Sequence, residues 1–494
     1  MIRGTNIKLS YNEIPTPVFV LVFSYSLVRN PMEVPFMKKE REVPTVKRAV
    51  LAFCFSILAL MSACAAAPAE ASGTQTEQLA VIEEAEKVEE ANALDGEHEE
   101  AEVSAEAEEP PAHTYDTSMQ YNAAVLADGE EILGGTYTAE GDDESVLEAS
   151  GTVQASVTGA VLQKLGGSAS STDDSSFRGV NAGVRVYGNA VVSLTDCEIL
   201  ATAPNATGVF AYEDGVIYMD NCTVNVTGGG AGGVQVAGGG TLIGHDLTVT
   251  SASKAAIRSD RGGGTLILGG GTYTSTGSNG CPAIYSTADI TVRNADCVSE
   301  NSRAVIIEGK NSVTLENCTL TGNDQSTKEG SVKANVLLYQ SASGDASEGT
   351  SLFSMTGGSM TCRSGAMFYC TNTASKVYLT DADLILSEDG TLLIVSAGRW
   401  GKDGRNGGNC AFAAQNQMLE GDILVDSIST LDLDLTNSSY NGAIRGEGSV
   451  SVTMDNDSTW VLTGDSYITS LSGDLSGLDL NGYTLFVNGI AYAP

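Results

Sequence analysis

The sequence predicts an all-β protein: a single right-handed parallel β-helix over residues 113–494, with about 11–12 coils of 23–25 residues and a disordered region before it. Two observations predict this fold. A turn-forming residue recurs at a nearly constant spacing, and apolar residues alternate with polar ones on both sides of it. No segment of the domain shows a convincing helical period.

The recurring turn residue is Asp, Asn or Gly. These residue types best tolerate a left-handed backbone, so we expect the same turn once per coil. The spacing is nearly even except for one long step between Asn317 and Gly357, which is assigned to an insertion at 321–349. The turn residues are Asp196, Asn221, Asp246, Gly270, Asn294, Asn317, Gly357 and Asp381.

Apolar residues stand two and four places before most turn residues and three places after them, which predicts two short strands flanking each turn. A third strand opens each coil, as in GVRV at 183–186 and AVII at 304–307. Three strands and three turns per repeat are typical of a right-handed parallel β-helix, in which every strand pairs with its equivalent one coil away. A string of β-sandwiches or a propeller would show longer, meander-like repeats.

Cysteine follows the turn residue in three coils, at Cys197, Cys222 and Cys318, where most other coils have Gly or Ala. We interpret these positions as a packing row inside the coils. Cys197 and Cys222 are stacked neighbours that could form a disulfide, but packing is the simpler interpretation. The absence of a CxxC motif argues against a zinc site.

Residues 37–63 are predicted to be an export signal, because an uncharged apolar run at 49–63 follows several Lys and Arg residues. The run ends in LMSAC and resembles a bacterial lipobox, which implies acylation of Cys64 and anchoring to the outer face of the bacterial cell membrane. Cleavage within 65–67, or an uncleaved anchor, are the alternatives. Residues 1–36 are predicted to be an over-long start, which means that translation would naturally begin near Met37. Alternatively, 18–28 is a second hydrophobic segment.

The segment 64–112 is predicted to be an acidic Ala/Glu-rich linker. Its residues 65–112 contain 15 acidic side chains against one lysine, so they lack the apolar surface to pack and they repel one another. We expect an extended spacer between the membrane and the domain; a partly helical solubilising tail is the alternative. Across the whole chain, 62 acidic and 26 basic residues give a net charge of -36, which excludes a nucleic-acid binder.

Segments such as SSFRGVNAGVRV and VIIEGKNSVTLENCTL resemble the secreted, adhesin-like β-helix proteins of anaerobic bacteria and, more distantly, the pectate-lyase-like superfamily. The resemblance covers about residues 120–490 and implies the fold. It implies little about activity, because lyases, hydrolases and passive binders share this scaffold.

Several charged residues are predicted to lie near the same corner of the coil, each group two coils from the next. There they could line a polar groove for a sugar chain. Solvent-facing turns of an acidic protein are the plainer explanation. The candidates are Glu213, Asp214, Arg258, Asp260, Arg261, Glu308 and Lys310. His245 lacks the paired aspartates of polygalacturonase-like enzymes, so no catalytic residue is assigned.

A second candidate is the irregular segment 396–416, where Trp400 offers an aromatic platform beside Lys402, Asp403 and Arg405. Trp400 would contact a sugar or pin the loop to its coil. Asp403, Asn406 and Asn409 could form a weak calcium loop; otherwise we expect neither metal nor cofactor.

The outward positions of the opening strands become apolar in the later coils, and we expect an insertion or a flanking segment to cover them. If these apolar residues were uncovered, they would form a surface for a partner. If the alignment of the repeats were wrong by one residue, some of them would instead lie inside the coil. The outward residues are expected to be Arg185, Phe210, Gln235, Arg258, Tyr285, Ile306, Leu337, Phe368 and Leu393. The segment with Trp460, Tyr467, Tyr483 and Phe486 is expected to cap the C-terminal end.

The expected function is that of a monomeric binding protein, anchored at the cell surface and adhesin-like, which recognises a glycan or a surface protein without catalysis. The alternative is a polysaccharide lyase or glycoside hydrolase on the same scaffold. A structural component of the envelope is the third possibility.

Overall fold

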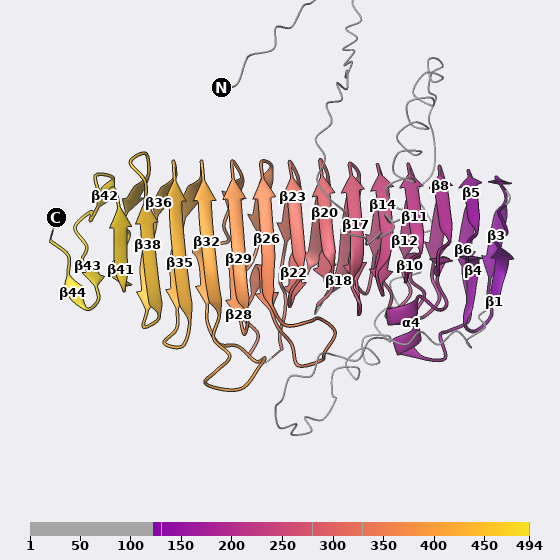
Figure 1. The fold of residues 1–494 in the computed structure, drawn as a ribbon, viewed down its shortest axis with the longest axis horizontal. Coiled ribbons are helices and arrows are strands. Elements are labelled where there is room, and N and C mark those ends of the chain that lie inside the picture. The colour runs from indigo at the N-terminus through magenta and orange to yellow at the C-terminus, as the bar shows by residue number, and fades with distance from the viewer. Residues whose placement is uncertain (1–121, 130, 279, 329, 494) are drawn as a thin grey trace, which may run out of the picture. The chain divides into compact units, whose positions relative to one another are not determined.

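The computed structural model describes residues 122–129, 131–278, 280–328 and 330–493. They form a stack of coils in which equivalent strands of successive coils pair in parallel (Figure 1). Three sheets, here called A, B and C, run along the stack, and sheet D follows sheet C in the last coils. This architecture confirms the expected all-β parallel β-helix.

Sheet A contains the opening strands β1 (Asn122–Leu126), β4 (Glu144–Ala149), β7 (Val184–Val186), β10 (Val209–Tyr212), β13 (Val234–Ala237), β16 (Ile257–Ser259), β19 (Ile284–Ser286), β22 (Val305–Glu308), β25 (Ala334–Tyr339), β28 (Ala366–Thr371), β31 (Thr391–Val395), β34 (Asp422–Val425) and β37 (Ile444–Gly446). One helix, α4 (Thr172–Arg178), lies between β6 and β7 in the described part of the chain.

Sheet B precedes the recurring turn and contains β2 (Glu131–Leu133), β5 (Gln154–Thr158), β8 (Val191–Thr195), β11 (Val216–Asp220), β14 (Gly240–His245), β17 (Gly264–Gly269), β20 (Asp289–Arg293), β23 (Ser312–Glu316), β26 (Thr350–Thr356), β29 (Ala374–Thr380), β32 (Asn409–Gln415), β35 (Thr430–Thr436), β38 (Ser449–Met454) and β41 (Ser470–Gly473).

Sheet C follows the turn and contains β3 (Thr136–Ala139), β6 (Val161–Lys164), β9 (Glu198–Ala201), β12 (Thr223–Val226), β15 (Thr248–Ser251), β18 (Thr272–Ser278), β21 (Asp296–Asn301), β24 (Thr319–Gly322), β27 (Ser359–Cys362) and β30 (Asp383–Ile385). Sheet D contains β33 (Met418–Glu420), β36 (Ser439–Asn441), β39 (Thr459–Val461) and β42 (Leu478–Asp479), and sheet E contains β40 (Ser466–Ile468), β43 (Leu485–Val487) and β44 (Ile490–Ala491).

The recurring turn has the predicted left-handed backbone at every predicted position. All eight turn residues have positive φ, from 48° at Asn221 to 69° at Gly270. The same conformation continues at Asn416 and Asn437 in later coils, which the sequence did not single out. The backbone N–H of each turn residue donates to a carbonyl of the next coil, as from Asn221 to His245 at 3.0 Å. The turn is therefore part of the stacking between coils.

Alternate strand residues point inward and form one continuous core, as the period-two pattern predicts. Cys197, Cys222 and Cys318 belong to this core, which confirms the packing row after the turn. The eight cysteines of the described residues are buried and unbonded, so Cys197 and Cys222 do not form a disulfide. Phe353, Phe368 and Phe412 pack edge to face through three successive coils, with ring centroids 5.7 and 5.5 Å apart.

The stack has more coils than expected. Sheet A has 13 strands and sheet B has 14, against the predicted 11–12 coils. The coils shorten towards the C-terminus, where Asn409 pairs with Thr430 and Thr430 pairs with Ser449. Both of these steps along the chain are shorter than any step between the predicted turn residues. These last coils lie beyond Asp381, where the predicted series of turn residues ends.

The C-terminal end is closed by sheet E, where β44 turns back to pair antiparallel with β43. Tyr467 and Phe486 stack there with ring centroids 5.0 Å apart. Trp460 instead lies in the coil interior against Tyr440, with its indole N–H donating to the Gly442 carbonyl at 3.1 Å. The aromatic residues of this segment therefore have two separate roles.

The predicted over-long start at 1–36, the signal at 37–63 with lipidation at Cys64, and the linker at 64–112 lie outside the described residues. In the part of the chain that the structure describes, no helix has the length and apolarity needed to cross a membrane.

Replacing an exposed turn residue tests how much each turn contributes to stability. Asn294 has φ 52°, where a β-branched side chain is strained and Asn or Gly is not. We expect Asn294→Val to lower the free energy of unfolding by about 1–2 kcal/mol, whereas Asn294→Gly changes it little. Urea denaturation monitored by circular dichroism measures the difference. Equal stability of the two variants would contradict the assignment.

Candidate functional site

The outward row of sheet A follows the predicted order for its first seven positions, from Arg185 to Leu337. The last two predicted positions are wrong: Leu337 pairs with Tyr369, and Tyr369 pairs with Ile394. Phe368 and Leu393 instead belong to the core. The predicted insertion at 321–349 contains β25, so the extra residues lie in loops on both sides of this strand. The prediction slipped by one residue between Leu337 in β25 and Tyr369 in β28, across the loop that follows Tyr339.

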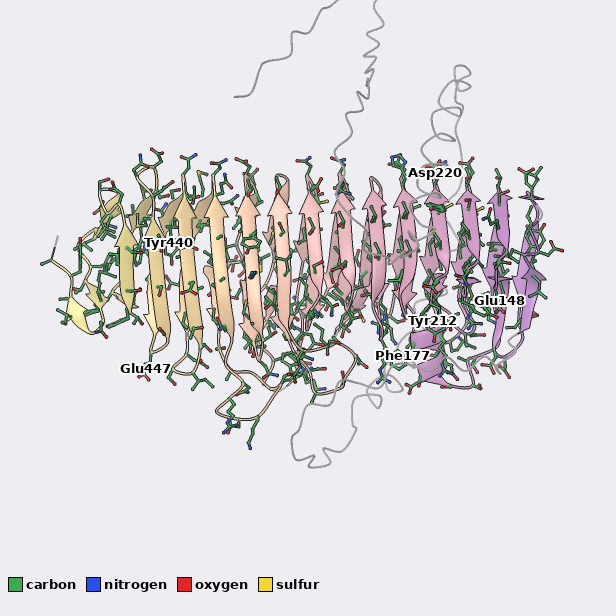
Figure 2. The ribbon with its side chains drawn as sticks, in the orientation of Figure 1. Glu148, Phe177, Tyr212, Asp220, Tyr440 and Glu447 are labelled. Carbon is green, nitrogen blue, oxygen red and sulfur yellow. The ribbon has the colours of Figure 1, made fainter. Side chains whose placement is uncertain are left out.

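This outward row is covered, as expected, by α4 and by the insertions. Gly179, which ends α4, lies so close to Phe210 that a Cβ there would come within 2.4 Å of the phenyl ring. Gln235 donates to the carbonyl of Ser176 at 2.8 Å. Figure 2 shows Phe177 at the edge of the stack opposite Asp220, and Figure 1 shows that α4 and the long loops emerge on this same side.

A buried ion pair lies beneath the start of this cover. Arg185 Nη1 lies 3.2 Å from Glu148 Oε2, and both side chains are almost completely buried. Arg185 Nε also donates to the carbonyl of Arg178, the last residue of α4, at 2.7 Å. Tyr187 donates to the other Glu148 oxygen at 2.9 Å. These hydrogen bonds compensate for the burial of the two charges and hold α4 on the sheet.

Of the predicted residues Arg258, Asp260 and Arg261, the first two pair with each other on the coil and the third contacts the cover. Arg258 Nη2 donates to Asp260 Oδ2 at 2.6 Å, with both side chains largely buried, and the Arg258 guanidinium lies over the Tyr285 ring. Arg261 pairs with Asp345 in the insertion and lies 4.0 Å from the ring centre of Phe177 in α4. Arg261 therefore joins two covering segments.

Glu308 is the centre of a second network. Its carboxylate is 1% exposed and accepts hydrogen bonds from Tyr285 at 2.6 Å, from Tyr339 at 2.8 Å and from Ser341. Burial raises the pKa of both phenols well above the ordinary value, so they remain donors. Ser341 begins the loop that carries Asp345, so Glu308 anchors this insertion.

Trp400 pins its loop to the coil. Its ring lies 4.5 Å from the Tyr339 ring, and the Arg399 guanidinium lies 4.5 Å from the indole. Asn406 Nδ2 donates to the carbonyls of Gly398 and Trp400, which closes the loop. The indole is thus occupied by protein groups on the Tyr339 and Arg399 sides.

The other predicted loop residues, Lys402, Asp403 and Arg405, are exposed on the loop. Asn409, from the predicted calcium loop, lies in β32 instead. Among the residues with described positions, no group of three His, Cys, Asp or Glu side chains could hold a metal ion.

Glu213 and Asp214 lie outside these networks. Glu213 has a left-handed backbone, and burial raises the pKa of its half-buried carboxyl group. Asp214 and Lys310 are exposed. The structure thus links Arg261 to the covering segments, pairs Arg258 with Asp260, and links Glu308 to the tyrosines. It does not join all the corner residues into one groove.

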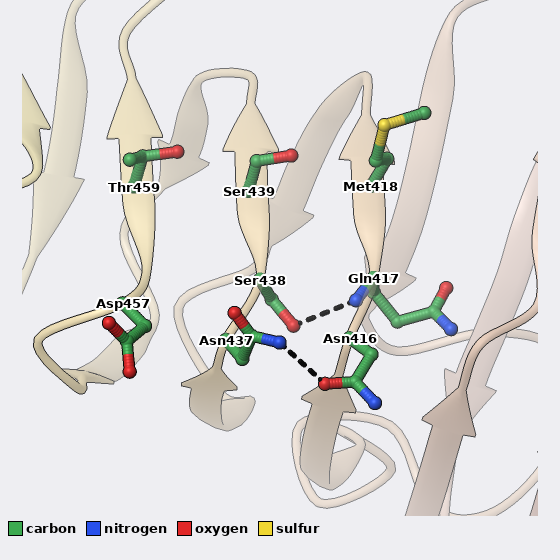
Figure 3. A pocket seen from close by; sticks show the side chains of 8 residues that line it. All are labelled: Asn416, Gln417, Met418, Asn437, Ser438, Ser439, Asp457 and Thr459. Carbon is green, nitrogen blue, oxygen red and sulfur yellow. Dashed lines mark hydrogen bonds between the residues drawn. The ribbon is translucent and has the colours of Figure 1, made fainter.

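A hollow of about 300 Å³ opens near the C-terminal end, on the side of sheet D. Figure 3 shows Met418, Ser439 and Thr459 in one row across three strands, with Asn416, Asn437 and Asp457 in the turns beside them. Asn437 Nδ2 donates to Asn416 Oδ1 at 2.8 Å, which orients both amides. Buried Gln417 and Ser438 form the floor, where the Gln417 N–H donates to Ser438 Oγ at 3.0 Å.

Sequence reasoning missed this hollow, and it missed Tyr339, Ser341 and Asp345 as partners of the predicted residues. A signal for the hollow exists in the series of left-handed turn residues from Asp196 to Asp381, here called the turn column. Asn416 and Asn437 continue this column after Asp381, although at uneven spacings. The partners in the insertion carry no periodic signal.

Removing the Glu308 carboxylate should release the insertion. We expect Glu308→Ala to lower the free energy of unfolding by about 2 kcal/mol or more, because two buried phenols lose their acceptor. Glu300→Ala, an exposed glutamate one coil earlier, is the control and should change it by less than about 0.5 kcal/mol. Thermal unfolding compares the variants. Similar melting temperatures would contradict the anchoring role of Glu308.

The buried tyrosines predict alkaline unfolding. Burial raises the pKa of Tyr285, Tyr339 and Tyr440 above the ordinary phenol value of 10.0. Their contribution to stability is fully present below that pH, and it is lost as the pH rises towards the folded pKa values, because the unfolded chain ionises first. Phenolate absorbance and circular dichroism should therefore change together. If all tyrosines ionised near pH 10 while the protein stayed folded, the raised pKa values of the buried phenols would be contradicted.

No family model, curated protein or solved structure matches this chain in the comparisons with known proteins. Its function is therefore inferred from the geometry described above.

Proposed function

We propose that this protein is a glycan-binding protein of the bacterial cell surface, which binds its ligand in the hollow beside sheet D and does not turn it over. The single observation that carries the proposal is the composition of the hollow. Amide, carboxylate and hydroxyl groups converge there around one exposed apolar side chain, Met418.

These groups suit the chemistry of a sugar. Sugar hydroxyls donate and accept hydrogen bonds, and side-chain carboxylates and amides pair with them in fixed directions. Asp457 supplies two acceptor oxygens, whereas Ser439 and Thr459 supply hydroxyls that both donate and accept. Met418 is 77% exposed and offers a polarisable surface for the C–H face of a sugar ring.

Binding is favoured over catalysis by the positions of two of the four carboxylates predicted for a lyase or hydrolase. Asp260 and Glu308 are 3% and 1% exposed and are engaged by Arg258 and by the two tyrosines. A general acid or base must reach its substrate, which these two groups cannot do beneath the cover. Polysaccharide cleavage is the second candidate function.

The proposal includes display at the outer face of the cell membrane, through a lipid on Cys64 and the acidic spacer at 64–112. A monomer would suffice, because the hollow is lined by residues of a single chain. A surface protein that carries the glycan is a compatible partner.

The test is affinity electrophoresis of the protein in gels containing single neutral or acidic polysaccharides, with and without calcium. We expect retardation by a neutral polysaccharide and at least a tenfold weaker affinity for Asp457→Ala, because a hydrogen bond to a charged group is lost. Asp434→Ala is the matched control, since Asp434 is an exposed aspartate on sheet B in a neighbouring coil.

A reducing-end assay on the same mixtures detects cleavage. Shortening of a polysaccharide would replace the binding proposal with the enzymatic one. The absence of both retardation and cleavage with every polysaccharide would overturn both.

A further inference from the structure

The outward face of sheet C is rich in threonine, in an arrangement that no candidate site above uses. At the two outward positions that its ten strands share, ten of the twenty residues are threonines, and the longer strand β21 also exposes Glu300. The first row is Thr136, Val161, Glu198, Thr223, Thr248, Thr272, Asp296, Thr319, Ser359 and Asp383, and the second row is Thr138, Gln163, Leu200, Asn225, Thr250, Thr274, Val298, Thr321, Thr361 and Ile385.

The parallel register stacks these threonines directly on one another. Thr223 pairs with Thr248 and Thr248 with Thr272 in the first row, while Thr250 pairs with Thr274 in the second. Neighbouring strands lie about 4.8 Å apart, and alternate residues of one strand about 6.6 Å apart. The hydroxyls therefore form a grid with a fixed spacing. Threonine is stiff at χ1, so this grid is ordered before any ligand binds.

The centre of this face carries no charge. The six outward residues of β12, β15 and β18 are Thr or Asn, on a protein whose net charge is -36. Hydroxyl and amide groups both donate and accept hydrogen bonds, so they complement a neutral polyol. The surrounding negative potential disfavours an acidic polymer, and the nearest carboxylates of the first row, Glu198 and Asp296, border the central block on either side.

The hollow lies in line with the grid, beyond β30, whose outward residues are Asp383 and Ile385. The equivalent of the first row in sheet D is formed by Met418, Ser439 and Thr459. Met418 and Ser439 each stand two residues after a turn residue, as the first-row residues of sheet C do. The turn column links the two regions through hydrogen bonds from Asn416 to Asp381 and from Asn437 to Asn416. A chain that leaves the hollow along the stack would therefore pass over Asp383 and Ile385 and then reach the threonines of sheet C.

We propose that this threonine face binds an extended, neutral polysaccharide that runs along the stack, with the hollow holding one of its sugar residues. The inference rests on the proposed glycan-binding function and adds the class of ligand and its direction. The strand spacing is comparable with the length of one sugar residue in an extended chain, so successive coils would meet successive sugars.

The decisive variant replaces Thr248, Thr250, Thr272 and Thr274 by valine in the full-length protein. Valine has the shape and strand preference of threonine but no hydroxyl, so the coils remain intact. The matched control replaces four outward threonines of sheet B by valine, namely Thr241, Thr265, Thr291 and Thr314. Circular dichroism melting verifies that both variants fold like the parent.

Affinity is measured for the neutral polysaccharide that retards the parent protein and for an oligosaccharide of it short enough to fill the hollow alone. We expect the sheet C variant to bind the polymer at least about tenfold more weakly, because several hydrogen bonds are lost together. It should bind the short oligosaccharide as the parent does, and the sheet B variant should match the parent with both ligands.

Two results would overturn the inference while leaving glycan binding intact. The first is that the sheet C variant binds the polymer as well as the parent does, whereas Asp457→Ala loses binding. The second is that the sheet C variant loses affinity equally for the polymer and for the short oligosaccharide. If the parent binds no polysaccharide at all, the proposed function fails and this inference fails with it.

Discussion

Every part of this structure depends on one repeated backbone turn. Asp, Asn and Gly residues place a left-handed conformation at the same point of successive coils, and the N–H of each turn bonds to the next coil. A shift of one residue at this turn would send the core residues of the following strand outward. The turn column thus fixes the register on which the core, the covered face and the exposed face all rely.

The sheets have different surroundings because the insertions all come to lie on one of them. Contacts continue from Phe177 through Arg261 to Asp345, while Ser341 joins the same insertion to Glu308. Tyr339 then connects Glu308 to Trp400. Arg261 and Glu308, which the sequence offered as site residues, therefore hold covering segments in place. The outward face of sheet C, which carries few charges, remains available for a ligand.

The periodic parts of the fold were predictable from the sequence, because each position is constrained by the same neighbours in every coil. Asn221 and Cys222 could be placed in the turn and the core from spacing alone. The prediction from alternation failed at Phe368, because the length of an insertion does not determine which residue of the next strand points inward. Asp345 and Ser341 were beyond reach for the same reason. The hollow lies where the coils shorten, so a fixed period did not lead to it.

The turn column also makes each coil an interchangeable unit between Asp196 and Asn317, where the repeat length is nearly constant. Duplication or loss of one such unit would keep every strand in register and leave both ends unchanged. Each event would move the C-terminal hollow relative to the first coil by one strand spacing, about 4.8 Å. The reach of the molecule is therefore adjustable in discrete steps by gene duplication, without any redesign of its core.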